Sequence, residues 1–81
     1  MTPYQFTLLN EKVKAELVLN GILLIEKMDG DRLFQLYYID GLYVDIWHDV
    51  ERHRVYSMRP YTFKTLPDQY LDTISIGEIA G

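Results

Sequence analysis

The chain has 81 residues and carries 12 acidic against 8 basic residues, which gives a formal net charge of −4 at pH 7. It contains no cysteine, which excludes disulfides, thiolate metal sites, iron–sulfur clusters and a cysteine nucleophile. A chain of this length is expected to form one domain, residues 1–81, that buries only about 60% of the surface its unfolded form exposes. The acidic balance and the scattered basic residues argue against nucleic-acid and anionic-membrane partners. The chain opens with no signal-peptide pattern, and no apolar run approaches the roughly 18 residues of a membrane span, so we expect a cytoplasmic protein.

The N-terminal segment is predicted to be an amphipathic helix. Thr2 followed by Pro3 is typical of a helix start, because the hydroxyl caps a free amide and the proline needs no N–H partner. Apolar side chains then recur at spacings of three and four, at Phe6, Leu9, Val13 and Leu17. Asn10 can cap a second helix, so residues 3–19 form either one helix or two pieces with a bend. We expect Asn20-Gly21 to end the helix in a left-handed conformation.

Four strands and a second helix are predicted to follow. The strands cover residues 22–28, 32–39, 42–48 and 54–58, the last ending before Pro60. Asp40-Gly41 is typical of a two-residue type I′ hairpin turn. A short C-terminal helix begins near Pro67, because Tyr70, Leu71 and Ile74 fall on one helical face. The predicted fold class is α+β, with an N-terminal helix on a four-stranded antiparallel β-meander and a short C-terminal helix.

The hairpin turn assigns alternate residues to two faces of the sheet. One face is largely aliphatic and is expected to lie under the N-terminal helix. Its members are Gln35, Tyr37, Ile39, Leu42, Val44 and Ile46, joined by Ile22 and Leu24 if the preceding turn has an even length. The other face is aromatic and holds the predicted binding residues Phe34, Tyr38, Tyr43, Asp45, Trp47 and, from the fourth strand, Tyr56. In a sheet with one solvated face, apolar and polar residues alternate along each strand. These strands do not alternate in this way, so we expect something to cover the aromatic face.

Three kinds of cover are open. The C-terminal segment can fold back through Phe63, Leu66, Tyr70 and Leu71, two copies of the face can meet in a homodimer, or the face can bind a peptide or an aromatic ligand. A buried carboxylate needs a partner, so we expect Asp45 to pair with Arg59 or Arg54. The alternative role for Asp45 is an acid or base in an apolar pocket.

The sequence gives little support for a metal, phosphate-binding, catalytic or nucleic-acid site. His48 and His53 stand near Asp45, Asp49 and Glu51, but the spacing matches no metal motif, and we expect no metal and no cofactor. A solvated loop in which Asp49 pairs with Arg54 is the expected arrangement. The sequence contains no glycine-rich phosphate loop and no nucleophile elbow. Arginine and tyrosine alternate in residues 52–61 like a platform for single-stranded nucleic acid, but the acidic total disfavours that function.

Several segments resemble a group of small bacterial proteins of unknown function. They are Lys14-Ala15-Glu16-Leu17-Val18 with Asn20-Gly21, Leu36-Tyr37, residues 40–46, Arg59-Pro60-Tyr61-Thr62-Phe63 and residues 70–74. The resemblance spans nearly the whole chain and implies a complete, free-standing protein with no known activity. From the aromatic face, we expect a non-enzymatic interaction domain that associates through that face, either as a homodimer or with another protein. The alternative is a small-ligand-binding or enzymatic domain with a pocket near Trp47 and Asp45.

Overall fold

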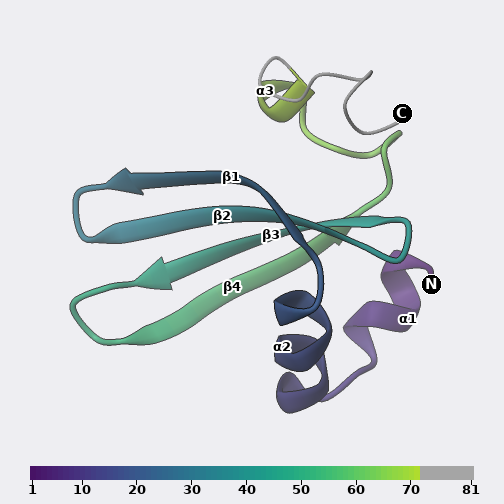
Figure 1. Cartoon of the computed structure of the whole chain (residues 1–81), viewed down its shortest axis with the longest axis horizontal. Coiled ribbons are helices and arrows are strands. Elements are labelled where there is room, and N and C mark those ends of the chain that lie inside the picture. The colour runs from purple at the N-terminus through teal and green to yellow at the C-terminus, as the bar shows by residue number, and fades with distance from the viewer. Residues whose placement is uncertain (72–81) are drawn as a thin grey trace.

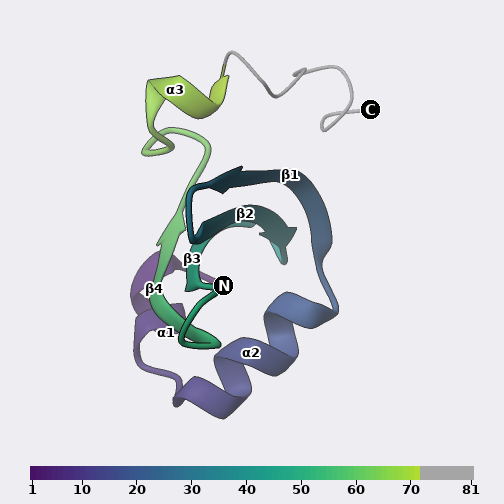
Figure 2. The same ribbon diagram turned by 90° about the vertical axis from the view of Figure 1, so that its left-hand side faces the viewer.

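The computed structural model describes residues 1–71 of the chain. Its elements are α1 (Pro3–Thr7), α2 (Glu11–Leu19), β1 (Ile22–Asp29), β2 (Arg32–Ile39), β3 (Leu42–Asp49), β4 (Arg54–Tyr61) and α3 (Asp68–Leu71). The strands pair antiparallel in the order β1-β2-β3-β4 (Figure 1). α1 and α2 lie on one side of this sheet and α3 on the other (Figure 2). The predicted α+β meander is confirmed, whereas Ile74 and the side chain of Leu71 lie outside the described part.

The N-terminal helix is divided into two pieces, each with its own cap. Thr2 and Gln5 form a capping box, in which the Gln5 amide donates to Thr2 Oγ1 at 3.1 Å and the Thr2 amide donates to Gln5 Oε1 at 2.8 Å. The Asn10 side chain accepts from the Val13 amide at 2.9 Å and so starts α2. The alternative with a bend before Asn10 is therefore confirmed.

The end of α2 differs from the expected left-handed stop. Asn20 has an ordinary right-handed φ of −90°, and Gly21 has no positive φ. Gly21 instead lies against β2, where an added Cβ would meet the Tyr38 carbonyl oxygen at 2.9 Å and Ile39 Cγ1 at 3.0 Å. Glycine is needed here because the backbone of one element approaches another closely.

The turn between β2 and β3 is the predicted type I′ turn, with φ of 47° at Asp40 and 81° at Gly41. It sets the register that we expected along the whole hairpin. Ile39 pairs with Leu42, and the pairing continues without a shift to Phe34 opposite Trp47. The division of these two strands into an aliphatic and an aromatic face is confirmed.

β1 departs from the prediction because it contains an irregularity. The pairing with β2 shifts between Leu23 and Ile25, so Leu24 is an extra residue. Ile22 consequently stands opposite Tyr38, and Leu24 packs against the aromatic side of the sheet. The expectation that Ile22 and Leu24 join the aliphatic face is wrong, although the turn before β2 has the even length on which it depended.

β4 continues through Pro60, where we expected it to have ended. Pro60 stands opposite Val44 in the β3–β4 ladder. β4 is an edge strand, and an edge strand tolerates a residue that lacks an N–H because only one side of it needs ladder bonds. The strand therefore carries Arg59 and Tyr61 along the sheet together with Pro60.

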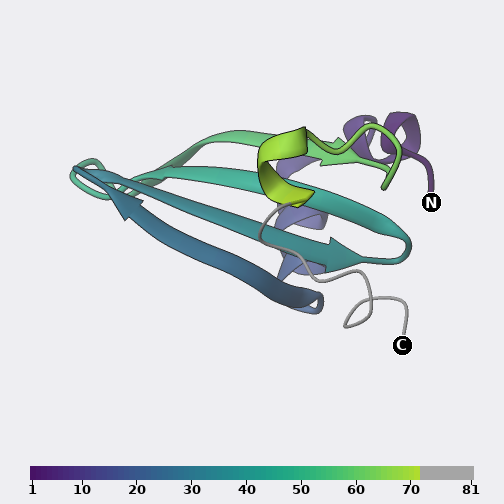
Figure 3. The ribbon, with the colours of Figure 1, turned by 90° about the horizontal axis from the view of Figure 1, so that it is seen from above.

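The two faces of the sheet hold two separate cores. The aliphatic face and the helices share the buried residues Phe6, Val18, Leu42, Val44 and Ile46. The buried residue of α2 is Val18, whereas Leu17 of the predicted stripe is half-buried. The second core lies under α3, which covers part of the sheet when the molecule is viewed from above (Figure 3). Within residues 1–71, no helix is long and apolar enough to cross a membrane.

Candidate functional site: the aromatic face

The aromatic face is the side of the sheet that carries Phe34, Leu36, Tyr38, Tyr43, Asp45 and Trp47. Five of the six predicted binding residues gather on it, and the four aromatic ones form two ring pairs. The ring centroids of Phe34 and Trp47 are 4.8 Å apart, and those of Tyr38 and Tyr43 are 5.1 Å apart. Phe34, Tyr43 and Asp45 are buried, and the other two are half-buried.

Tyr56, the sixth predicted residue, lies at the margin of this cluster, where it lines a hollow together with Trp47. The β3–β4 pairing shifts between Trp47 and His48, so that Ser57 stands opposite Trp47 and Tyr56 is an extra residue. The Tyr56 side chain is 46% exposed, and the Arg32 guanidinium lies 5.8 Å from its ring centroid. Tyr56 therefore belongs to the outer end of the sheet.

Asp45 is fully buried at the centre of the aromatic face. Its Oδ1 accepts from Arg59 Nε at 3.3 Å, and its Oδ2 accepts from Arg59 Nη2 at 3.2 Å. The hydroxyls of Tyr61 and Tyr70 donate to the same Oδ2, each at 3.2 Å. Among the described residues, no buried side-chain polar atom lacks a partner. Of the two predicted partners for Asp45, Arg59 is confirmed, and Arg54 stands opposite Asp49 instead.

Burial and the charge of Asp45 shift the pKa of its neighbours. Burial, and then the nearby Asp45 carboxylate, raise the pKa of Tyr61 and Tyr70 above the ordinary tyrosine value. Burial, followed by the neighbouring Tyr38, also raises the pKa of Tyr43. The hydrogen bonds and charge of Asp45 raise the pKa of the Arg59 guanidinium. Near neutral pH, the tyrosines thus remain hydrogen-bond donors, and the network holds a buried carboxylate in place.

The C-terminal segment covers one part of the aromatic face. Leu66 and Tyr70 are buried against it, and the Tyr70 ring stacks on Phe34 at a centroid distance of 5.2 Å and an angle of 15°. The ring centroids of Phe63 and Tyr43 are 6.2 Å apart, but the Phe63 side chain is 43% exposed. The first of the three expected kinds of cover is thus present in part.

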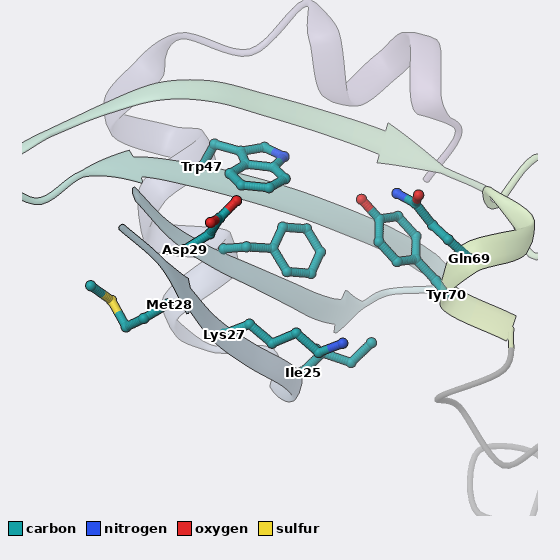
Figure 4. A pocket seen from close by; sticks show the side chains of 8 residues that line it. Ile25, Lys27, Met28, Asp29, Trp47, Gln69 and Tyr70 are labelled. Atoms are coloured by element: carbon teal, nitrogen blue, oxygen red, sulfur yellow. The ribbon is translucent and has the colours of Figure 1, made fainter. Parts of the chain in front are cut away.

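A cleft of about 370 Å³ remains open beside α3, at the edge formed by β1 (Figure 4). Ile25, Phe34, Trp47 and Tyr70 provide apolar and aromatic walls, and Lys27 and Asp29 from β1 also line it. Asp45 is not among the lining residues. The cleft therefore includes Trp47 but not Asp45, the other residue near which we expected a pocket.

The two histidines line one shallow hollow together with Asp49 and Arg54. His48 Nε2 lies 2.7 Å from Gln35 Oε1, and Gln35 Nε2 donates to Glu26 Oε1 at 3.2 Å. His53 occupies the turn before β4 with a φ of 53°. Within residues 1–71, no three histidine, aspartate or glutamate side chains are grouped as metal ligands.

The predicted pair of Asp49 with Arg54 is replaced by a pair within the turn. Asp49 Oδ2 lies 3.7 Å from Arg52 Nε, and Asp49 Oδ1 accepts from the Arg52 amide at 3.1 Å. A carboxylate three residues before an amide in a turn readily closes this local bond. Asp49 consequently pairs with Arg52, its neighbour in the turn, and not with Arg54, which stands opposite it on β4.

The sequence alone missed the roles of Tyr61 and Tyr70 as donors to Asp45. One signal was present, because Arg59 and Tyr61 alternate on the same face of a strand. Tyr70 had no such signal, since its position depends on the path of the chain after β4.

The chain was compared with family models, with curated proteins and with solved structures. No family model matches it, and neither the curated proteins nor the solved structures gave a match. The resemblance to small bacterial proteins stays a prediction.

Proposed function

We propose that this protein is a non-enzymatic interaction domain that self-associates through the cleft beside α3. One observation carries the proposal. The cleft combines apolar walls, from Ile25, Phe34 and Trp47, with two side chains of opposite charge on β1, Lys27 and Asp29. A solvated apolar hollow of this kind is typical of an association surface. Met28, which also lines the cleft, is 59% exposed. Ile22 of the same strand lies outside the cleft lining and is 61% exposed, so the apolar surface extends beyond the cleft.

The charges that line the cleft favour a second copy of the chain as its occupant. Lys27 and Asp29 are two residues apart in β1, and alternate residues of a strand share a face. In a two-fold dimer the same patch meets itself. An axis that passes between the two side chains would set Lys27 against Asp29 of the partner subunit, and it would do so twice.

Small size supplies a further physical reason for association. A domain of 81 residues leaves a large share of its apolar surface in water. Burying the cleft and the neighbouring side chains against a second copy would remove part of that surface from solvent, which favours the dimer through the hydrophobic effect.

The test is the solution mass by light scattering over a range of concentrations, for the wild type and for charge-reversed variants. We expect a dimer for the wild type. Lys27→Asp and Asp29→Lys should each raise the dissociation constant by about tenfold or more, because each sets like charges against one another. The double variant should recover the dimer, since it restores both pairs with their signs exchanged.

Lys12→Asp, on the exposed side of α2, is the matched control and should leave the mass unchanged. A wild type that is monomeric at high concentration would refute self-association. A double variant that dissociates more than either single variant would refute the proposed pairing. Trp47→Ala, checked for folding by circular dichroism, should also weaken the dimer, and an unchanged mass would mean that the contact lies on another face.

A further inference from the structure

All four arginines of the chain line two adjoining hollows at one end of the sheet. The first hollow measures about 330 Å³ and is lined by Asp31, Arg32, Asp49, Arg52, Arg54 and Tyr56. The second measures about 300 Å³ and is lined by Arg32, Trp47, Tyr56, Ser57 and Arg59. Arg32 and Tyr56 belong to both, so the two hollows form one continuous surface. In a chain with a net charge of −4, this is a local concentration of positive charge.

Two of these arginines are already neutralised, and two are not. Arg59 is bound to Asp45, and Arg52 to Asp49. Within the part of the chain that the structure describes, neither Arg32 nor Arg54 lies within 4.0 Å of a carboxylate. Because Arg52 already engages Asp49, Asp31 is the remaining acidic side chain in the first hollow. A pair of unneutralised guanidinium groups suits a phosphate, which accepts two parallel hydrogen bonds from each.

Flat side chains adjoin these two cations. The Arg32 guanidinium lies 5.8 Å from the centroid of the Tyr56 ring, and that ring is 46% exposed. The half-buried Trp47 lines the neighbouring hollow. Aromatic rings and guanidinium planes both provide surfaces on which nucleobases stack.

We propose that the two hollows bind a nucleoside phosphate. The phosphate is held by Arg32 and Arg54, and the base stacks in the second hollow beside Tyr56 and Trp47. Each hollow lies near the lower end of the range of about 300–1,000 Å³ that is typical of small-molecule sites. A small ligand fits better than a long nucleic acid, because the remaining surface of this acidic protein would repel an extended polyanion. Of the residues that line the cleft proposed for self-association, this site shares only Trp47.

The fluorescence of Trp47, the one tryptophan of the chain, reports on binding directly. Titrations with adenosine monophosphate, adenosine and inorganic phosphate separate the two parts of the site. We expect saturable binding of the monophosphate, at least about tenfold tighter than either fragment and weakened by added salt. Adenosine that binds as tightly would refute the phosphate position, and phosphate that binds as tightly would refute the stacking surface. A single-stranded oligonucleotide that binds when the monophosphate does not would overturn the assignment to a small ligand.

Variants place the ligand on the named residues. Arg54→Gln should weaken the monophosphate by about tenfold or more, since hydrogen bonds to charged groups are strong, and it should leave adenosine unaffected. Tyr56→Ala should weaken both ligands, whereas Tyr56→Phe, which keeps the ring, should weaken neither. Lys64→Gln, an exposed cation elsewhere, is the control for net charge. An effect of Lys64→Gln as large as that of Arg54→Gln would overturn the site, and so would an unchanged affinity in Arg54→Gln with native circular dichroism.

Discussion

Asp45 and Arg59 form a two-point ion pair across β3 and β4, with Nε on Oδ1 at 3.3 Å and Nη2 on Oδ2 at 3.2 Å. The Asp45 side chain is fully buried, whereas that of Arg59 is 59% exposed. Because Tyr61 and Tyr70 donate to the same carboxylate, one side chain of the inner strand β3 connects the edge strand β4 and α3. Stability should therefore depend strongly on this residue and its partners.

Removing Arg59 leaves a buried carboxylate without its cation. We expect Arg59→Met to lower the free energy of unfolding by about 3 kcal/mol, the low end for breaking a buried pair, because water already reaches the Arg59 head group. Urea unfolding followed by circular dichroism measures the change. Arg52→Met, which breaks the more exposed pair with Asp49, should cost less than about 1 kcal/mol. Equal losses in the two variants would contradict the role given to Asp45.

The Tyr70 hydroxyl and the Tyr70 ring contribute separately. Tyr70→Phe loses the bond to Asp45 and keeps the stack on Phe34, so we expect a loss of about 1–2 kcal/mol. Tyr70→Ala loses both and should cost about 3–5 kcal/mol. Thermal and urea unfolding of the two variants give the comparison. If the two substitutions were equally costly, the stacking seen at 5.2 Å would contribute nothing.

Stability should fall at alkaline pH. The folded-state pKa values of Tyr43, Tyr61 and Tyr70 are raised above the ordinary tyrosine value of 10.0, so the unfolded chain loses these protons first as the pH rises. The stability that these three protonated tyrosines contribute is fully present below pH 10, and it is lost as the pH rises through their folded-state pKa values.

Urea unfolding between pH 8 and 11.5, with tyrosinate absorbance as a second signal, tests this pH dependence. In Tyr61→Phe/Tyr70→Phe the fall above pH 10 should be shallower than in the wild type, because two of the three shifted groups are gone. A wild type whose stability rises over this interval would show that the sign of the linkage is reversed.

Gly21 should tolerate no side chain. Its Cβ would stand 2.9 Å from the Tyr38 carbonyl oxygen and 3.0 Å from Ile39 Cγ1, so we expect Gly21→Ala to cost about 1–3 kcal/mol through overpacking. Gly30→Asn is the control, because nothing lies within 4 Å of that position and asparagine accepts a φ of 63°. In urea unfolding, Gly21→Ala should lose more free energy of unfolding than Gly30→Asn. Equal losses would contradict close approach as the reason for glycine at residue 21.

The parts of the fold that the sequence predicted correctly rest on local chemistry. Asp40-Gly41 specifies its turn and, through the turn, the register of β2 and β3. Thr2 and Asn10 cap the helices that follow them. The candidate site was predictable to the same extent, because five of the six predicted residues belong to the strands that this turn aligns, and because the buried Asp45 needed a cation within reach.

The parts that could not be predicted depend on contacts between distant segments. The extra residue Leu24 carries no local signal, and it moved Ile22 away from the helix side. Pro60 is tolerated only because β4 lies at an edge, which no neighbouring residue in the sequence reveals. Tyr56 is likewise displaced by a second irregularity in pairing, and the cover on Phe34 depends on where the chain returns after β4.

The contact between Asp45 and Tyr70 has a consequence for the order of folding. The meander closes by neighbouring hairpins, whose contacts are short in sequence, whereas this hydrogen bond joins residues 25 positions apart. Closing a longer loop costs more chain entropy, so we expect the sheet to assemble first and Tyr70 to dock on it afterwards. A segment held by few contacts opens with a smaller free energy than the inner strands of a sheet, and amide hydrogens near Tyr70 should therefore exchange with solvent well before those of β3.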